Sequence, residues 1–404
     1  MNLGLSKAKR PDKFDFVLIA LLVLMMCTSL LSIAAASGII GTSASTFYIV
    51  KQAAFFLGGF GVIAILHYIG NDSLFDFAKI GYWILMGCLV LCFIGHVYNK
   101  MTGSPTNQTF LGFISTVNGA TSWFNFPVLG SFQPSEYMKI VLVIISANII
   151  DEHNKNKAID SFELDFNLFI EILKWALPPM ILIFLQPDTG VCIIIAISIA
   201  AMVLCSGIKK EWIVFIGVFL LIAILLFAFL YVYHYDFLGK LIGGPYKLTR
   251  FNGWLHPEEN VGGDGYHLYM ALLAIGSSGF TGHGMGVNLV DIPEAQTDFI
   301  FAVIGQSWGL IGTVFIVVLC AGLDLYLCRI ATACENMFEK YIVIGVLGIL
   351  IYQQVQNIGM VVGLLPITGI TLPLISYGGS SIISYMIAFG IIFNVSCKSK
   401  KHVE

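Results

Sequence analysis

Charged side chains are scarce in this chain: 21 Lys and Arg and 24 Asp and Glu make up 11% of its 404 residues, whereas soluble domains average about 25%. Hydrophobic residues make up 57%. A soluble protein of this length has too little interior to hide so much apolar surface, so a soluble enzyme is excluded. The net charge is only −3, which gives no electrostatic footprint for nucleic acid. The composition therefore predicts a polytopic membrane protein.

Disulfide and metal patterns are also missing. None of the nine cysteines falls in a segment that we expect outside the membrane on the external side, and none forms a CxxC pair. The histidines show no HExxH spacing. The sequence therefore predicts neither a disulfide framework nor a zinc site.

Long apolar runs, by contrast, are abundant. A spanning helix needs roughly 20 mainly apolar residues, and ten segments approach or meet this length. We therefore predict that residues 1–404 form one all-α integral membrane domain of about ten transmembrane helices. The expected spans are 16–37, 47–69, 80–98, 137–150, 168–185, 191–208, 212–233, 299–327, 341–364 and 372–395.

The distribution of Lys and Arg orients these spans. Fourteen basic residues lie in the two termini and alternate loops, and only four lie in the opposite loops. Because basic residues accumulate on the cytoplasmic side, both termini are predicted to be cytoplasmic. The four external basic residues are Lys100, Lys240, Lys247 and Arg250.

Polar residues concentrate at the external ends of the spans. The clusters are 133–136, 186–190 and 293–298, followed by a run of amides on the ninth span and the stretch 366–381. The long external loop 234–298, between the seventh and eighth spans, is expected to form amphipathic and re-entrant pieces. Irregular backbone at membrane depth is tolerated where it lines a wet cavity, so these segments indicate a site.

The carboxylates in these clusters each have a structural and a chemical interpretation. Glu136 and Lys139, spaced i, i+3, can form an ion pair. Asp188 can cap the helix that follows it, and so can Asp298. A long polar loop precedes Asp298 and an apolar span follows at once. Since charges near membrane depth are costly and usually functional, both interpretations stay open.

Polar groups at one membrane face suit either transport of a polar or anionic group across the bilayer or group transfer on a lipid-linked substrate. A transporter would usually show an internal repeat with broken helices, and none is clear here. For glycosyl transfer from a diphospholipid, a carboxylate such as Asp298 can act as the base. The leaving diphosphate needs positive charge, and Lys247 and Arg250 form the basic pair in the external loop.

The motifs resemble those of one family over almost the whole chain. Residues 130–139 resemble QPSExxK, 186–190 resemble QPDxG, and 293–302 resemble PExHTDFIFA. Residues 265–279 and 357–381 are similar to two further signatures. The chain is thereby identified as a member of the SEDS family (RodA, FtsW and SpoVE), the peptidoglycan glycosyltransferases, and the spacing at 130–132 favours a RodA-like member.

This resemblance implies that the protein polymerises lipid II at the external face of the bacterial plasma membrane, in cell elongation, division or sporulation, together with a class B penicillin-binding protein. It implies Asp298 as the essential aspartate and suggests Mg2+ or Mn2+, without a readable ligand set. A lipid-precursor flippase and a non-catalytic scaffold for a transpeptidase are the alternatives. The substrate-binding candidates are Glu136, Lys139, Asp188, Lys247, Arg250, Gln356, Asn357, Ser376 and Ser380.

The sequence also departs from the family pattern. A basic residue that usually precedes Trp123 is replaced by Ser122, and the His of the HTD motif by Gln296. An acidic pair is replaced by Gln306 and Ser307, and Thr371 stands where a proline is usual. Losing a cation and two acids changes the charge balance of an external site.

Overall fold

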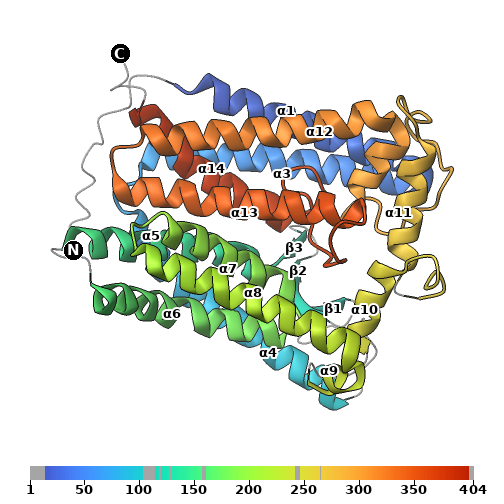
Figure 1. Cartoon of the computed structure of the whole chain (residues 1–404). Helices are drawn as coiled ribbons and strands as arrows, with labels where there is room; N and C mark the ends of the chain where they lie inside the picture. The colour runs from blue at the N-terminus through green and yellow to red at the C-terminus, as the bar shows by residue number, and fades with distance from the viewer. Residues whose placement is uncertain are drawn as a thin grey trace.

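The computed structural model describes residues 14–102, 114–117, 120–126, 130–156, 161–241, 246–263 and 265–399. It is a bundle of long helices with a small sheet and several short helices at one end (Figure 1). The helices are α1 (Phe16–Ala35), α2 (Ser37–Ile40), α3 (Thr42–Ile69), α4 (Leu74–Thr102), α5 (Pro134–Asn156), α6 (Phe162–Leu185), α7 (Thr189–Leu204), α8 (Lys210–Tyr233), α9 (Tyr235–Leu241), α10 (Tyr246–Leu255), α11 (Tyr266–Ser277), α12 (Ile300–Ala333), α13 (Met337–Val361) and α14 (Gly379–Ser399).

Eight of the described helices are long and apolar enough to cross a membrane: α1, α3, α4, α6, α8, α12, α13 and α14. The other two expected spans correspond to α5, which carries many polar residues, and α7, which has only 16 residues. The prediction of an all-α, multi-pass membrane protein is thus confirmed. The start of α1 and the end of α14 lie at one end of the bundle, and the sheet, α10 and α11 lie at the other (Figure 1).

The last predicted span begins in the wrong place. Hydropathy alone suggested a start at residue 372, but α14 begins at Gly379, and residues 366–378 are not helical. Pro366 and Pro373 each lack a backbone N–H, and proline inside a helix kinks or breaks it. Gly369 has a φ of +68°, which also ends helical geometry. Residues 366–378 therefore form an irregular segment before α14.

A three-stranded antiparallel sheet, which the sequence analysis did not foresee, precedes α5. Its strands are β1 (Ile114–Val117), β2 (Ala120–Phe126) and β3 (Gly130–Phe132), paired in the order β1-β2-β3. Phe124 pairs in register with Phe132 and packs with Ile114 and Cys92 in a small apolar cluster against α4. Because β3 runs directly into Pro134, the sheet fixes where α5 starts.

The core of the bundle is built around α13 and α14. Of the eight apolar helices these two are the most buried, whereas α8 has no buried residue at all. The helix α14 packs along α3, and the approach is close: a Cβ on Gly59 would lie 2.4 Å from the Met386 side chain, and one on Gly379 would lie 2.4 Å from the Phe55 ring. This close packing sets the position of the segment that leads into α14.

Candidate active site

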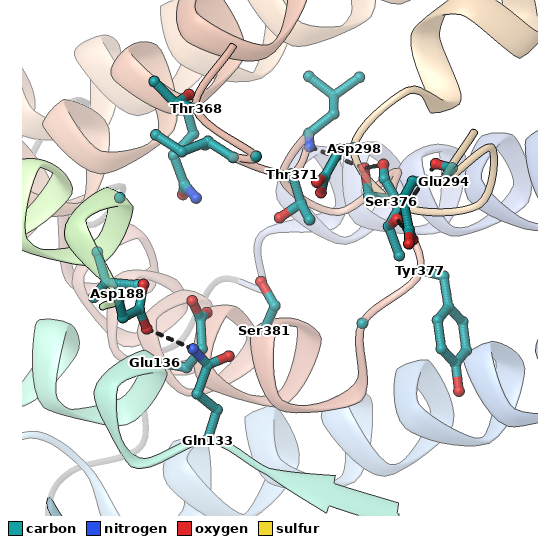
Figure 2. Close-up of a pocket in the computed structure, with 18 of the residues that line it drawn as sticks. Gln133, Glu136, Asp188, Glu294, Asp298, Thr368, Thr371, Ser376, Tyr377 and Ser381 are labelled. Carbon is teal, nitrogen blue, oxygen red and sulfur yellow. Dashed lines mark hydrogen bonds between the residues drawn. The ribbon is translucent and has the colours of Figure 1, made fainter. Parts of the chain in front are cut away.

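A cavity of about 710 Å³ opens among the polar segments at the end of the bundle that carries the sheet. Figure 2 shows two acidic walls: Glu294, Asp298 and Ser376 lie on one, and Gln133, Glu136 and Asp188 lie on the other. The first wall comes from the turn before α12 and the segment before α14. The second comes from the start of α5 and the α6–α7 turn.

Asp298 stands at the end of a tight turn before α12. The backbone N–H groups of Thr297 and Phe299 both donate to the Glu294 carbonyl, at 3.1 and 3.3 Å. Asn357 Nδ2 donates to the Asp298 carbonyl at 2.8 Å, which ties this turn to α13. Phe299, not Asp298, occupies the cap position of α12, so the capping interpretation of Asp298 is not what the structure shows.

The Asp298 carboxylate is poised to accept a proton. Burial, and secondarily the Glu294 carboxylate, raise the pKa of Asp298 from 3.8 to about 7, because both disfavour the charged form. A Cβ placed on Gly369 would lie 3.3 Å from Asp298 Oδ2, so the irregular segment before α14 passes close to this carboxylate. A base with a pKa near the working pH is well matched to general-base catalysis.

Asp188 faces the start of α5 across the cavity. Its Oδ2 accepts hydrogen bonds from Gln133 Nε2 at 2.8 Å and from Ser135 Oγ at 3.2 Å. Asp188 also occupies the cap position of α7, and the Val191 backbone N–H in the first turn of that helix donates to its carboxylate, so the capping and chemical interpretations are compatible. Burial, and secondarily Glu136, raise the pKa of Asp188 to about 6. The carboxylate is therefore mostly ionised at neutral pH.

Glu136 forms the predicted ion pair and also lines the cavity. Lys139 Nζ lies 2.7 Å from Glu136 Oε2, and the Lys139 side chain is completely buried. The same ammonium donates to Tyr385 Oη at 3.0 Å. Since Glu136 is in the cavity lining, the structural and chemical interpretations are compatible: Lys139 holds a carboxylate that a ligand can reach.

The segment before α14 is fixed by hydrogen bonds to the turn before α12 and to α3. Ser376 Oγ donates to the Thr297 carbonyl at 2.7 Å and accepts from the Leu372 N–H at 2.9 Å. Gln52, a buried residue of α3, donates from Nε2 to the Ser376 carbonyl at 3.0 Å and accepts from the Gly378 N–H at 3.3 Å. These bonds satisfy backbone groups that no helix satisfies and fix the wall next to Asp298.

Ser380 connects the same segment to the opposite wall. Its Oγ donates to the Ser131 carbonyl at 2.6 Å and accepts from the Gln133 N–H at 3.0 Å. The start of α14 is thereby fixed to β3 and to the start of α5.

The structure brings half of the predicted site residues into one cavity. The predicted residues that line it are Glu136, Asp188, Asp298, Ser376 and Ser380. Lys139 lies behind Glu136. Lys247 and Arg250 lie on α10, and their side chains are outside what the structure describes. The roles assigned to all ten residues remain predictions.

Gln356 and Asn357 lie outside the lining of the cavity. Gln356 Nε2 donates to the Pro366 carbonyl at 2.9 Å. Asn357 Nδ2 donates to the Ile370 carbonyl at 2.7 Å as well as to that of Asp298. Both amides therefore hold the backbone of the site in place, and their substrate-binding role stays a prediction.

Several lining residues were not singled out as site residues from the sequence. Gln133 stands beside Glu136 in a motif already noted, so that signal was available. Gln353 belongs to the polar run on α13, but the sequence alone does not say which of its amides faces a cavity. The other polar and aromatic lining residues not singled out are Trp123, Ser131, Thr189, His267, Glu294, Thr297, Phe299, Thr368, Thr371, Tyr377 and Ser381.

Three departures from the family pattern lie away from the cavity lining. Gln306 is buried, and its Nε2 donates to the Val287 carbonyl at 3.1 Å while its Oε1 accepts from the Val290 N–H at 3.0 Å. A carboxylate could not donate the first of these bonds, so Gln306 fits its place as a brace for this loop. Ser307 is also buried, and the buried hydroxyl of Ser122 has no hydrogen-bond partner among the described residues.

Two departures lie at or beside the wall that carries Asp298. Thr371 lines the cavity. The Gln296 carbonyl accepts from the Tyr377 N–H at 2.9 Å, a backbone contact that any residue at 296 can make. The segment before α14 therefore keeps its attachment to the Asp298 turn despite the missing histidine.

The cavity is rich in carboxylates and poor in cations. Among the described residues its lining contains Glu136, Asp188, Glu294 and Asp298, but neither Lys nor Arg. No group of three or more His, Cys, Asp or Glu within the described ranges could hold a metal ion by itself. Mg2+ is commonly held by one or two carboxylates together with substrate phosphates. The donor set thus fits a cation that binds with a phosphorylated ligand, not a preformed protein cage.

Comparisons with known proteins agree with this architecture. A sequence profile of the FtsW, RodA and SpoVE family, described as "Cell cycle protein", matches residues 13–401. The chain is 30% identical over 406 residues to the probable peptidoglycan glycosyltransferase FtsW of Geobacter sulfurreducens, covering 99% of both chains. It is 29% identical over 395 residues to the stage V sporulation protein E of Bacillus subtilis, covering 96% of this chain and 98% of that protein.

Two solved structures share the fold. One belongs to work on the structural coordination of polymerization and crosslinking by a peptidoglycan synthase complex. It superposes with a TM-score of 0.73 at 23% identity, covering 95% of this chain and 98% of that one. The other is the rod shape determining protein RodA of Thermus thermophilus, with a TM-score of 0.61 at 23% identity, covering 97% and 99%.

Proposed function

The chain belongs to the FtsW, RodA and SpoVE family of cell cycle proteins, and on this premise we propose that it is a peptidoglycan glycosyltransferase that polymerises lipid II. The observation that carries the proposal is the position of Asp298. It lies in a cavity of about 710 Å³ with a pKa raised to about 7. A flippase needs no such base.

Asp298 takes the proton from the attacking sugar hydroxyl in the proposed reaction. The hydroxyl oxygen then forms a bond to the anomeric carbon of the second lipid-linked sugar, whose bond to the diphosphate oxygen breaks. The lipid diphosphate leaves with the electron pair of that bond. Asn357 positions this base by holding the Asp298 carbonyl at 2.8 Å. Glu294, the second cause of the raised pKa, helps to bring the pKa of Asp298 close to neutral pH.

The opposite wall is the proposed place of the leaving diphosphate. Glu136 and Asp188 would hold a Mg2+ or Mn2+ ion brought by that group, and the ion would supply the positive charge that the departing diphosphate requires. Lys139 neutralises Glu136, so this wall retains roughly the charge of the single Asp188 carboxylate. Figure 2 shows the two walls with Ser381 between them. In the proposed reaction the attacking hydroxyl binds at the wall with Asp298 and the leaving diphosphate at the wall with Asp188.

The proposed orientation places the cavity at the external face. The charge count of the loops puts both termini in the cytoplasm, and the start of α1 and the end of α14 lie at the end of the bundle away from the sheet (Figure 1). The proposed partner is a class B penicillin-binding protein, which the family resemblance supports.

The test is polymerisation of lipid II by the purified full-length protein together with its class B partner. The wild type should produce glycan strands, and Asp298→Asn should not, because an amide cannot accept the proton. A wild type that moves labelled lipid II across vesicles without making polymer would establish the flippase alternative. Equal activity in Asp298→Asn would remove the base assignment.

A further inference from the structure

Gln353 is a lining residue whose amide the proposed reaction does not yet use. It lies on α13, is only 2% exposed, and contributes to the wall of the cavity. Its Oε1 accepts a hydrogen bond from Tyr385 Oη. Within the described residues its Nε2 has no hydrogen-bond partner, yet this atom is not among those fully enclosed by protein. The amide nitrogen therefore faces the cavity.

The orientation of this amide is set by a buried lysine. The Lys139 ammonium donates to Tyr385 Oη at 3.0 Å and lies 4.3 Å from the centre of the Tyr385 ring. An ammonium can only donate, so the tyrosine hydroxyl must accept from it. Ser381 is a second side chain that donates to this hydroxyl oxygen, so the single hydroxyl proton is left for Gln353. A carbonyl oxygen can receive this proton and an NH2 group cannot, so the oxygen faces Tyr385 and the NH2 faces the cavity.

The three side chains are held rigidly enough to impose this arrangement. Lys139 is 1% exposed and Tyr385 is fully buried. They come from α5, α14 and α13, which pack on one another, so no one of them can turn without breaking a buried hydrogen bond. A buried donor or acceptor left without its partner costs about 1–3 kcal/mol, which disfavours a flipped amide.

The surroundings determine what an exposed NH2 group can bind. Four carboxylates surround the cavity, and its described lining offers no Lys or Arg. Hydrogen-bond acceptors of the protein are therefore plentiful, while donors come only from amides, hydroxyls and a few other neutral groups. A ligand oxygen that only accepts hydrogen bonds needs one of these donors, and Gln353 offers two N–H bonds in a fixed direction.

We propose that Gln353 is a substrate-binding residue that donates from Nε2 to an acceptor oxygen of the lipid-linked sugar diphosphate, and that Lys139 and Tyr385 are positioning residues that present this donor. The identity of the substrate rests on the proposed function. The acceptor is either an oxygen of the sugar portion, such as an acetamido carbonyl, or an oxygen of the diphosphate. The same hydrogen-bond chemistry serves both.

The experiment measures binding separately from turnover. The full-length protein in nanodiscs is titrated with fluorescent lipid II and with undecaprenyl diphosphate, which lacks the sugars, and polymerisation is measured on the same preparations. Gln353→Leu should weaken lipid II binding about tenfold, the effect of roughly one hydrogen bond. Weakening with both probes assigns the diphosphate as acceptor, and weakening with lipid II alone assigns the sugar.

Gln353→Glu separates a donor from a merely polar residue. The glutamate keeps an oxygen for Tyr385 but places a second oxygen where the NH2 group was, so binding should fall at least as far as in Gln353→Leu. Gln354→Leu is the matched control, because Gln354 is the next amide on α13 and donates to Asp324 at 3.3 Å, outside the cavity lining. This control should bind both probes as the wild type does. Thermal unfolding of each variant checks its folding.

Tyr385→Phe tests the positioning role through non-additivity. Alone it should weaken lipid II binding about threefold, because the amide loses its fixed orientation. Combined with Gln353→Leu it should have no further effect, since there is no amide left to orient. Additive losses would overturn the positioning role, because residues acting independently show no coupling. Tyr352→Phe is the matched control, because Tyr352 also lies on α13 but is not part of the cavity lining.

The outcomes distinguish this inference from the proposed function. If the wild type polymerises lipid II and Gln353→Leu binds it normally, the inference fails and the function stands. If the wild type binds lipid II without polymerising it, and Gln353→Leu weakens that binding, the function fails and the inference stands. If the wild type neither binds nor polymerises lipid II, both fail.

Discussion

The protonation of Asp298 should control the pH range in which this protein works. Burial and the neighbouring Glu294 raise the pKa of Asp298 from 3.8 to about 7. Only the ionised carboxylate can accept a proton from the attacking hydroxyl. We therefore expect kcat/KM, which reports the free enzyme, to rise with pH through the neutral range and to level off above it.

The size of the effect follows from the titration of a single group. One pH unit below its pKa, about one carboxylate in eleven is ionised, so the rate at pH 6 should be about a tenth of the plateau rate. Glu294→Gln removes the negative charge that contributes to the raised pKa, and it keeps an oxygen for the 2.9 Å hydrogen bond from Thr297 Oγ1. The midpoint of its profile should therefore move to lower pH.

The assay is the initial rate of glycan formation from lipid II at a series of pH values, for the wild type and three variants. Asp298→Asn should be inactive throughout. Glu258→Gln removes an exposed carboxylate that does not line the cavity, so its profile should match the wild type. A wild-type midpoint near the ordinary pKa of an aspartate, or a Glu294→Gln profile that does not move, would refute the reasoning.

Three further predictions follow from the walls of the cavity. Lys139→Met leaves the buried Glu136 carboxylate without its partner and should cost about 3–5 kcal/mol of stability, measured as a lower Tm. Adding Glu136→Gln to the same chain should recover part of the loss. A wild-type Tm in Lys139→Met would contradict this prediction. Gly369→Ala strains a residue with φ of +68° and brings a methyl group to 3.3 Å from Asp298 Oδ2, so polymerisation should fall about tenfold, and an unchanged rate would show that the carboxylate tolerates the shift. Chelation with EDTA should abolish polymerisation and added Mg2+ should restore it, because the described lining has no Lys or Arg for the diphosphate; full activity in EDTA would assign that charge to the protein.

The spans could be predicted because a lipid-facing helix must be apolar over most of its length. This is clearest for α8, which has no buried residue and whose limits, Lys210–Tyr233, nearly match the expected 212–233. The start of α14 was missed for the opposite reason. Leu372, Leu374 and Ile375 are apolar because they are buried in protein, so hydropathy continued through a segment that is not a helix.

The sheet before α5 could not be read from the sequence with the same ease. Its strands have only three to seven residues, and the alternation in β2 is too short to outweigh the surrounding pattern. Its effect on the site is nevertheless direct, because β3 holds Ser380 through the Ser131 carbonyl. That contact joins residues 249 positions apart in the chain, a distance that local patterns do not register.

Site residues whose role follows from their residue type were predicted from the sequence. Residues whose role depends on where the side chain points were missed. Asp298, Glu136 and Asp188 stand out because carboxylates near a membrane need a reason. Among the polar residues 353, 354, 356 and 357 of α13, the sequence analysis named Gln356 and Asn357 as substrate-binding candidates and left out Gln353. The structure separates them: Gln353 lines the cavity, whereas Asn357 holds backbone behind it. Only the packing of α13 against its neighbours decides between these roles.

Positive charge is scarce in the described lining of the cavity, and this scarcity links two of the tests. Lys139 is the cation buried beside the lining, and it is already neutralised by Glu136 at 2.7 Å. An anionic ligand must therefore bring its own cation or rely on neutral donors such as Gln353. If EDTA abolishes polymerisation and Gln353→Leu weakens lipid II but not undecaprenyl diphosphate, then the cation holds the diphosphate and the amide holds the sugar. The two groups then bind different ends of one substrate, which fixes the direction in which it lies between Asp188 and Asp298.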